Sequence, residues 1–247
     1  MPQHTVRVCV SEMSRSNNLE EKLTAFGNGF YGIYEENKEL CSVVSYPDRG
    51  PWGNHRYRGN CSGYLIKDLI LRFKAQSVFD PAEGGGTTRD VVKGINEFLR
   101  KEVYYEGRDL KHGWDILSSD LPETKFDLVF YHPPYWDIIK YNEDSRDLSN
   151  CISLRDFEQR LVQSVERLAE TVKPGGVMAI LIGDKRRAGS YYVLMRKLLI
   201  ENEKIGQLKS VIIKLQHNTA SDRKSYFMNP FLIPIKHEYC LIFQKDR

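Results

Sequence analysis

The sequence predicts an α/β protein with a doubly wound, mainly parallel sheet that helices cover on both faces. Helix-period and strand-like segments alternate from about residue 63 onward. The nearly continuous apolar runs at 126–131 and 177–182 suit strands that are buried on both faces. A glycine-rich turn after residue 80 joins a strand to a helix. With 247 residues, the chain can hold one such core but not comfortably a full second domain.

The first predicted elements are a buried helix and the strand that follows it. An apolar stripe at helical spacing runs through Leu65, Ile66, Leu69, Ile70 and Phe73, and Ser62 precedes it as a capping residue. The strand at 77–80 leads through the turn PAEGGG into a helix with the apolar face Val91, Val92, Ile95, Phe98 and Leu99. Residues 103–106 and 126–131 are predicted to form further strands.

A long amphipathic helix should begin at Ser153, because Asp156 follows three residues later in a capping pattern. The residues that should stop this helix are Lys173, Pro174, Gly175 and Gly176. After the strand at 177–182, a further helix is expected over residues 190–203.

Two late strands, 209–216 and 237–245, should form an antiparallel pair across a polar loop whose length suggests a function. Residues 1–58 do not fit the α/β alternation. They are therefore predicted to be an N-terminal extension that contacts substrate, followed by one domain over residues 59–247.

Composition bounds the class of protein without naming a function. The chain is 41% apolar and 28% charged, which is ordinary for a folded domain. Its 36 basic and 33 acidic residues permit a polyanionic partner but form no polybasic signature. No apolar run suggests a membrane span or a secretory signal, so we expect a cytoplasmic protein with no membrane partner. Five scattered cysteines without a C-x-x-C pair support neither a disulfide framework nor a metal site: Cys9, Cys41, Cys61, Cys151 and Cys240.

The glycine-rich turn has the properties of a ligand site. Gly84 and Gly86 tolerate positive φ and let backbone approach a ligand closely. The P-loop lysine is absent and the spacing is not G-x-G-x-x-G, which disfavours phosphate binding. An acidic residue downstream, Asp109 or failing that Glu106, could bind a ribose diol. A tight turn and a solvated carboxylate would look the same from these residues alone.

His132, Pro133, Pro134 and Tyr135 directly follow the strand at 126–131, and so are expected where ligand sites of open α/β sheets gather. This tetrapeptide, with DPAEGGGTT at 80–88, resembles the class I S-adenosylmethionine-dependent amino-methyltransferases of the DNA N6-adenine/N4-cytosine type. Those enzymes carry D-P-P-Y, N-P-P-Y or S-P-P-Y. The similarity extends from Gly59 to Gln244 and implies a Rossmann-like, seven-stranded sheet with an antiparallel last strand.

The resemblance implies S-adenosylmethionine as the cofactor and assigns residues to it. Contacts to its amino-acid part would come from the turn residues Asp80, Pro81, Gly84, Gly86, Thr87 and Thr88, with Ala82 in place of the family's Phe. By the same resemblance, Asp109 would hold the ribose and Asp115 the adenine amino group. The segment 59–73 would close the methionine pocket.

The tetrapeptide suits transfer to an aromatic amino group, which is a poor nucleophile until hydrogen-bond acceptors orient its hydrogens. The first side chain and a proline carbonyl would be the acceptors, and the Tyr135 ring would stack on a flipped base. His132 stands where the family has Asp, Asn or Ser, and an imidazole accepts a hydrogen bond only while neutral. Activity is therefore predicted to fall as His132 protonates, between about pH 7.5 and 5.5. A protein that binds the cofactor without catalysis is the rival interpretation.

The favoured function is a site-specific DNA methyltransferase, of the kind found in restriction-modification systems, acting on N6 of adenine or next on N4 of cytosine. An RNA guanine-N2 or adenine methyltransferase is the alternative. Only 16 residues separate Asp115 from His132, which leaves no room for a target-recognition domain. Predicted nucleic-acid contacts are Arg49, Arg56, Arg58, Trp136, Lys185 and Arg186, together with the loops 136–150 and 217–230. The sequence is compatible with a homodimer or with a separate specificity partner.

Overall fold

The computed structural model describes residues 33–34, 40–200, 203–217 and 229–247. In this part of the chain, a seven-stranded sheet has the order β1-β8-β9-β5-β4-β2-β3. All its strands run in one direction except β9, which is antiparallel to both neighbours. This confirms the predicted fold class. The strands are β1 (Val43–Ser45), β2 (Ser77–Asp80), β3 (Tyr104–Gly107), β4 (Phe126–Tyr131), β5 (Val172–Gly183), β8 (Gln207–Leu215) and β9 (His237–Gln244).

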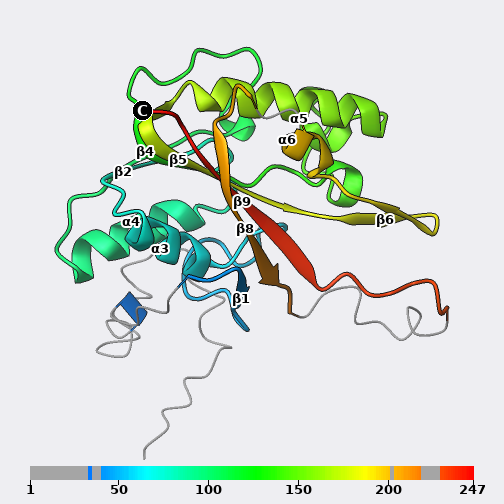
Figure 1. Ribbon diagram of the computed structural model, residues 1–247, viewed down its shortest axis with the longest axis horizontal. Coiled ribbons are helices and arrows are strands. Elements are labelled where there is room, and N and C mark those ends of the chain that lie inside the picture. The colour runs from blue at the N-terminus through cyan, green and yellow to red at the C-terminus, as the bar shows by residue number, and fades with distance from the viewer. Residues whose placement is uncertain (1–32, 35–39, 201–202, 218–228) are drawn as a thin grey trace, which may run out of the picture.

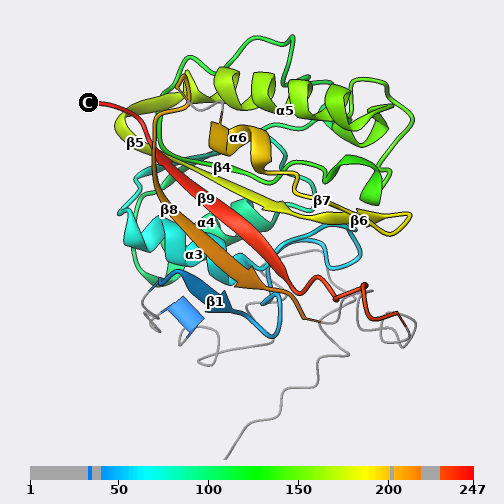
Figure 2. The ribbon, with the colours of Figure 1, turned by 45° about the vertical axis from the view of Figure 1, so that its right-hand side comes forward.

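Helices cover both faces of the sheet (Figures 1 and 2). The helices α3 (Gly63–Arg72) and α4 (Thr87–Phe98) pack on one face, and α5 (Leu154–Ala169) and α6 (Arg196–Ile200) pack on the other. Alternate residues of each strand point to opposite faces. In β4, for example, Leu128 and Phe130 join the α3–α4 core while Val129 and Tyr131 join the α5–α6 core. The buried positions on both faces of β4 are therefore apolar, as the sequence predicted.

Residues before Gly59 take part in the α3–α4 core. The short strand β1 pairs in parallel with β8 at one edge of the sheet. Trp52 is fully buried and meets the rings of Tyr34 and Tyr64 edge-on. Aromatic burial in an irregular segment leaves no periodicity, so the sequence could not place it. Substrate contact by residues 1–58 stays a prediction, and residues 1–32 and 35–39 lie outside the described part.

The boundaries of α5 are partly as predicted. The Ser153 hydroxyl accepts a hydrogen bond from the backbone N–H of Asp156 at 3.1 Å, which confirms the capping pattern. The helix ends at Ala169, however, and β5 already begins at Val172. The predicted stop at Lys173–Gly176 was therefore wrong, because this segment is the first part of a strand. Ser62 precedes α3 as predicted, but its hydroxyl donates to the carbonyl of Asp48 at 3.3 Å and caps nothing.

The predicted helix over 190–203 was also wrong over its first half. Two short strands, β6 (Lys185–Arg187) and β7 (Ser190–Tyr192), form an antiparallel hairpin, which extends to the right in Figure 2. The turn consists of Ala188 and Gly189, with φ of 49° and 82°, and consecutive positive φ values favour a tight hairpin. Residues 201 and 202 lie outside the described part.

Three further findings concern the described residues alone. None of their helices is long and apolar enough to cross a membrane. No group of three or more His, Cys, Asp or Glu side chains among them could hold a metal ion. The cysteines in this part, Cys41, Cys61, Cys151 and Cys240, carry free thiols.

Candidate active site

The glycine-rich turn leaves β2 and enters α4 at the carboxyl edge of the sheet. Gly84 and Gly86 have φ of 51° and 78°, and Gly86 is the residue that caps α4. The Tyr57 ring lies against the turn, because a Cβ added at Gly84 would be 2.9 Å from a ring carbon of Tyr57. The backbone N–H of Asn54 also donates to the Gly85 carbonyl at 2.8 Å. The segment before α3 thus covers the turn.

Asp80 is buried at the start of this turn. One of its carboxylate oxygens accepts from the Ala82 backbone N–H at 3.0 Å, and the other accepts from the Thr88 hydroxyl. Burial raises the pKa of Asp80 to about 7, although these two hydrogen bonds oppose the shift. Near neutral pH the carboxyl group is thus poised between its two protonation states, and a nearby cation would favour the charged state.

Asp109 connects the end of β3 to the glycine turn. Its carboxylate accepts from the backbone N–H of Gly84 at 2.7 Å and from that of Lys111 at 2.9 Å, where it caps a short helix, η1 (Leu110–His112). Each carboxylate oxygen keeps a further lone pair for a ligand. Glu106, the fallback for the ribose role, instead pairs with Arg108 at 2.7 Å.

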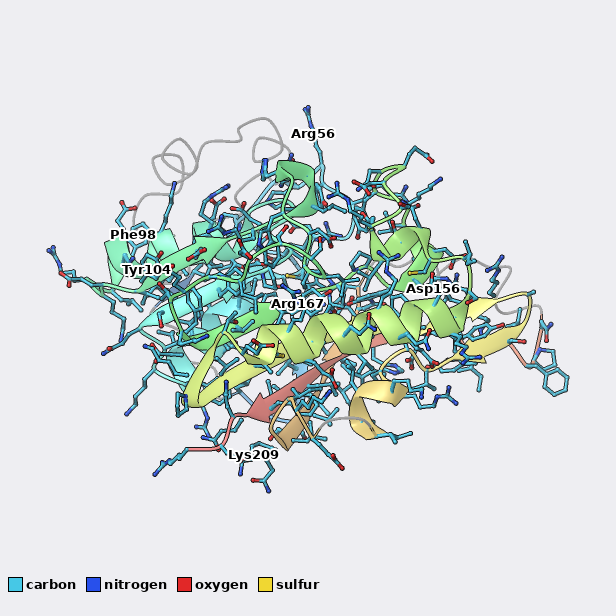
Figure 3. The ribbon with its side chains drawn as sticks, turned by 90° about the horizontal axis from the view of Figure 1, so that it is seen from above. Arg56, Phe98, Tyr104, Asp156, Arg167 and Lys209 are labelled. Carbon is cyan, nitrogen blue, oxygen red and sulfur yellow. The ribbon has the colours of Figure 1, made fainter. Side chains whose placement is uncertain are left out.

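Asp115 is buried and held by its own loop. It accepts from the backbone N–H of Leu117 at 3.0 Å and from the Ser118 hydroxyl at 2.6 Å. Arg167, which is labelled on α5 in Figure 3, donates to the carbonyls of Leu117 and Ser119 at 2.8 and 2.6 Å. The helix on the far face thereby fixes the loop that carries Asp115.

A cavity of about 380 Å³ opens above the turn, which we call the turn cavity. Of the predicted cofactor residues, those that line it are Asp80, Pro81, Gly84, Thr87, Thr88, Asp109 and Asp115. Among the described residues, six carboxylates and two cationic side chains, Lys111 and Arg146, contribute to its wall. The excess of carboxylates favours a cationic ligand.

The tetrapeptide lies beside this cavity, directly after β4. His132 Nε2 is 2.9 Å from the Tyr135 hydroxyl oxygen, and that hydroxyl donates to Glu238 at 3.0 Å. The Tyr135 ring packs on Gly183 of β5, where an added Cβ would be 2.7 Å from a ring carbon. The Tyr135 side chain therefore contacts two neighbouring strands, β5 and β9.

Burial lowers the pKa of His132 from 6.5 to about 4. The carboxylate of Glu238 opposes this shift, and the charges of Lys214 and Arg49 add to it. Because the imidazole stays neutral down to about pH 5, the predicted loss of activity between pH 7.5 and 5.5 does not follow from this residue. Its protonation belongs to a more acidic range.

A second cavity, of about 570 Å³, lies on the other side of His132, and we call it the outer cavity. Its wall includes Pro133 and Tyr135 of the tetrapeptide and three of the predicted nucleic-acid contacts, Arg49, Lys185 and Arg186. The two cavities share Gly59, Asn60, His132 and Tyr141. His132 is thus the tetrapeptide residue that faces both.

The other single residues predicted to contact nucleic acid line neither cavity, whereas the predicted loop 136–150 contributes to both walls and residues 218–228 of the loop 217–230 lie outside the described part. Arg56 and Arg58 are exposed, and Arg56 projects from the body of the molecule in Figure 3. Trp136 is only 5% exposed, in the short helix η2 (Trp136–Ile138), and its indole N–H donates to the Cys151 carbonyl at 3.0 Å. The Lys185 ammonium lies 4.3 Å from the centre of the Trp136 ring and pairs with Asp137. Trp136 therefore supports basic side chains and is not itself on the surface.

Sequence reasoning missed several residues of the site. Glu238 and Lys214 are buried charged residues within the strands β9 and β8. An isolated charged residue in an otherwise apolar strand was the sequence signal that could have identified them. Tyr57 and Tyr141 stack with ring centres 5.8 Å apart at the wall of the turn cavity. No sequence pattern near either tyrosine indicates that the two rings stack.

No protein-family model matches the sequence, and a search of curated proteins found no match. Solved structures do resemble the fold. A Thermus thermophilus protein described provisionally as a DNA modification methylase, solved with S-adenosyl-L-methionine, is 22% identical over 52% of this chain and 51% of its own, with a TM-score of 0.37. The chain thus matches about half of that protein's length.

Two further structures match over more of their length. The N-methyltransferase NodS from Bradyrhizobium japonicum, in complex with S-adenosyl-L-homocysteine, is 12% identical over 88% of this chain and 99% of its own, with a TM-score of 0.40. The [4+2]-cyclase SpnF is 11% identical over 93% and 96%, with a TM-score of 0.45. At these identities the likeness concerns the fold, and the function has to be inferred from the site.

Proposed function

We propose that this protein is an S-adenosylmethionine-dependent methyltransferase that modifies an exocyclic amino group of a nucleic-acid base. The observation that carries the proposal is the position of His132 between the two cavities. A residue that orients an amino group toward a methyl donor has to face both the donor and the acceptor. The turn cavity would hold the donor and the outer cavity the base.

The turn cavity fits the donor by charge and by size. S-adenosylmethionine carries a positive sulfonium and a positive ammonium group, which suit a wall with six carboxylates. A volume of about 380 Å³ lies within the range of small-molecule sites. Asp80 and the turn residues would hold the amino-acid part, Asp109 the ribose and Asp115 the adenine. The bound cofactor supplies an electrophilic methyl group.

His132 and Pro133 would orient the substrate amino group. A neutral imidazole nitrogen and a proline carbonyl each accept one N–H, which directs the nitrogen lone pair. The lowered pKa of His132 keeps the ring in the accepting form at neutral pH. This favours catalysis over the rival role of a cofactor-binding subunit without turnover, since a protonated ring could not accept.

The polymer we favour is DNA, with N6 of adenine as the first target and N4 of cytosine as the next. Arg49 and Arg186 at the outer cavity would meet phosphates, which position a strand without reading its sequence, whereas Lys185 is buried and paired with Asp137. The hairpin β6–β7 carries Lys185 and Arg186. RNA is the second candidate because phosphate contacts do not distinguish the two polymers.

The deciding experiment supplies purified protein with tritiated S-adenosylmethionine and, in separate reactions, duplex DNA, single-stranded DNA, tRNA and a protein mixture. Nucleoside mass spectrometry then identifies the product. N6-methyladenine in DNA is expected. Label in tRNA alone would show that the substrate is RNA and not DNA. Binding of the cofactor with no transfer to any acceptor would favour a cofactor-binding subunit without catalysis.

A further inference from the structure

A chain of hydrogen bonds runs from a buried ion pair to His132. The Lys214 ammonium donates to one Glu238 oxygen at 2.7 Å, and the other Glu238 oxygen accepts from the Tyr135 hydroxyl at 3.0 Å. The same hydroxyl oxygen is 2.9 Å from His132 Nε2. Lys214 and Glu238 are paired residues of β8 and β9, and their side chains are only 9% and 10% exposed.

The protons of this chain can be placed by elimination. The positive charge of Lys214 lowers the pKa of Glu238, although burial alone would raise it, so the carboxylate is ionised and can only accept. Tyr135 has a single hydroxyl proton, which must therefore lie on the Glu238 side. If the proton pointed away from Glu238, lone pairs of the Tyr135 and Glu238 oxygens would face each other at 3.0 Å, which is repulsive.

It follows that the Tyr135 oxygen accepts from His132, whose Nε2 must carry the proton. A neutral imidazole has one N–H and one bare nitrogen, so Nδ1 is the acceptor. In the part of the chain that the structure describes, no hydrogen bond joins Nδ1 to another residue. The ring lines both cavities, which makes this bare nitrogen the candidate acceptor for a ligand.

We propose that Glu238 and Lys214 are positioning residues that hold His132 in its Nε2–H tautomer through the Tyr135 hydroxyl, so that Nδ1 accepts a hydrogen bond from the substrate amino group. The assignment of Nδ1 to the substrate rests on the proposed function, whereas the tautomer does not. A purely structural ion pair would explain the contact between Lys214 and Glu238. It would not explain why the second carboxylate oxygen accepts a hydrogen bond from Tyr135, which also contacts His132.

The test measures the tautomer directly, by ¹⁵N NMR of the full chain labelled at its six histidines, with His132→Gln used to assign the signal. Wild-type protein should show the Nε2–H form. The double variant Lys214→Met/Glu238→Gln removes both charges together, so no buried charge is left unpaired. Because an amide can donate as well as accept, Tyr135 can then donate to His132, and the signal should move to a mixture of tautomers.

Tyr135→Phe is the second variant, since it breaks the chain while keeping the ion pair and most of the ring packing. It should give the same mixture of tautomers. In both variants the kcat for methyl transfer should fall about tenfold or more, while affinity for S-adenosylhomocysteine stays within about twofold. Asp127→Asn is the matched control, because its pair with Lys173 at 2.8 Å lies at the opposite end of β4. It should leave the His132 signal unchanged.

A wild-type signal of the Nδ1–H form would overturn the proposal, as would an unchanged Nε2–H signal in both variants. A shift of the tautomer in a protein that transfers no methyl group would support the positioning role and contradict the proposed function. The two ideas can therefore fail separately.

Discussion

The two cavities on either side of His132 differ in the charges that line them. In the turn cavity, six carboxylates face two cations among the residues that the structure describes. In the outer cavity, Arg49, Lys185 and Arg186 balance Asp137, Asp184 and Glu238. The carboxylates of the turn cavity come from the end of β2 and from loops that follow parallel strands, whereas the cations of the outer cavity come from the N-terminal segment and a hairpin. The sheet edge thus separates a cavity with an excess of carboxylates, suited to a small cation, from one whose charges balance.

If the two cavities bind the proposed methyl donor and acceptor, His132 between them has to be uncharged. A protonated His132 would repel a sulfonium on one side and lose its acceptor on the other. Burial of the ring, which lowers its pKa to about 4, prevents both. If the two cavities are as distinct as their linings indicate, substitutions in one should leave binding in the other unchanged.

The largest effect is expected where the cavities meet. His132→Ala should lower the rate of methyl transfer by about 10²–10³-fold, because the amino group loses an orienting acceptor. Affinity for S-adenosylhomocysteine should change by less than about threefold, as measured by calorimetry beside single-turnover kinetics. His112→Ala is the control, since His112 is exposed and lines neither cavity. A wild-type rate in His132→Ala would show that the tetrapeptide is not the catalytic site.

The next effect should be confined to the turn cavity. Gly84→Ala should weaken cofactor binding by about tenfold or more, because the new Cβ meets the Tyr57 ring in a strained conformation. Gly113→Ala is a matched control: its φ is also positive, at 86°, but nothing lies within 4 Å of the added Cβ. Equal losses of affinity in the two variants would mean that backbone strain, and not the closeness of Tyr57, is responsible.

The pH dependence of cofactor binding gives a third comparison. Burial raises the pKa of Asp80 to about 7, so below pH 7 the free protein must release a proton when a cation binds beside this carboxylate. Affinity for S-adenosylmethionine should therefore rise about tenfold from pH 6 to pH 8. Titration calorimetry in buffers of different ionisation enthalpy would detect the released proton. Asp80→Asn should bind more weakly and without this dependence, and a pH profile that survives the substitution would assign it to another group.

The smallest effect is expected in the outer cavity. Arg49→Ala should weaken DNA binding by about threefold to fivefold and reduce the slope of log affinity against log salt by about one. Affinity for the cofactor should stay the same, because Arg49 does not line the turn cavity. Arg100→Ala, an exposed change after α4, is the control. If Arg49→Ala weakened cofactor binding as much as DNA binding, the two cavities would not be separate.

Much of the fold could be predicted because its signals are local. The strand at 126–131, the helix capped by Ser153 and the glycine turn each follow from residues within a few positions of one another. The predictions failed where tertiary pairing overrides local preference, as in Lys173–Gly176, which extends β5, and Ser190–Tyr192, which pairs with Lys185–Arg187. Backbone pairing partners far along the chain leave no trace in a short window of sequence.

By itself, the sequence determined the class of fold, the glycine turn and the tetrapeptide at the end of a central strand, since periodicity and special backbone conformations are written in neighbouring residues. Only the tertiary structure decided that His132 lies between two cavities and is neutral. Lys214, Glu238 and Tyr135 come from segments that meet only in the folded protein, where they form one chain of hydrogen bonds with His132. Burial and hydrogen-bond direction depend on every element packed around a group, and no local pattern encodes them.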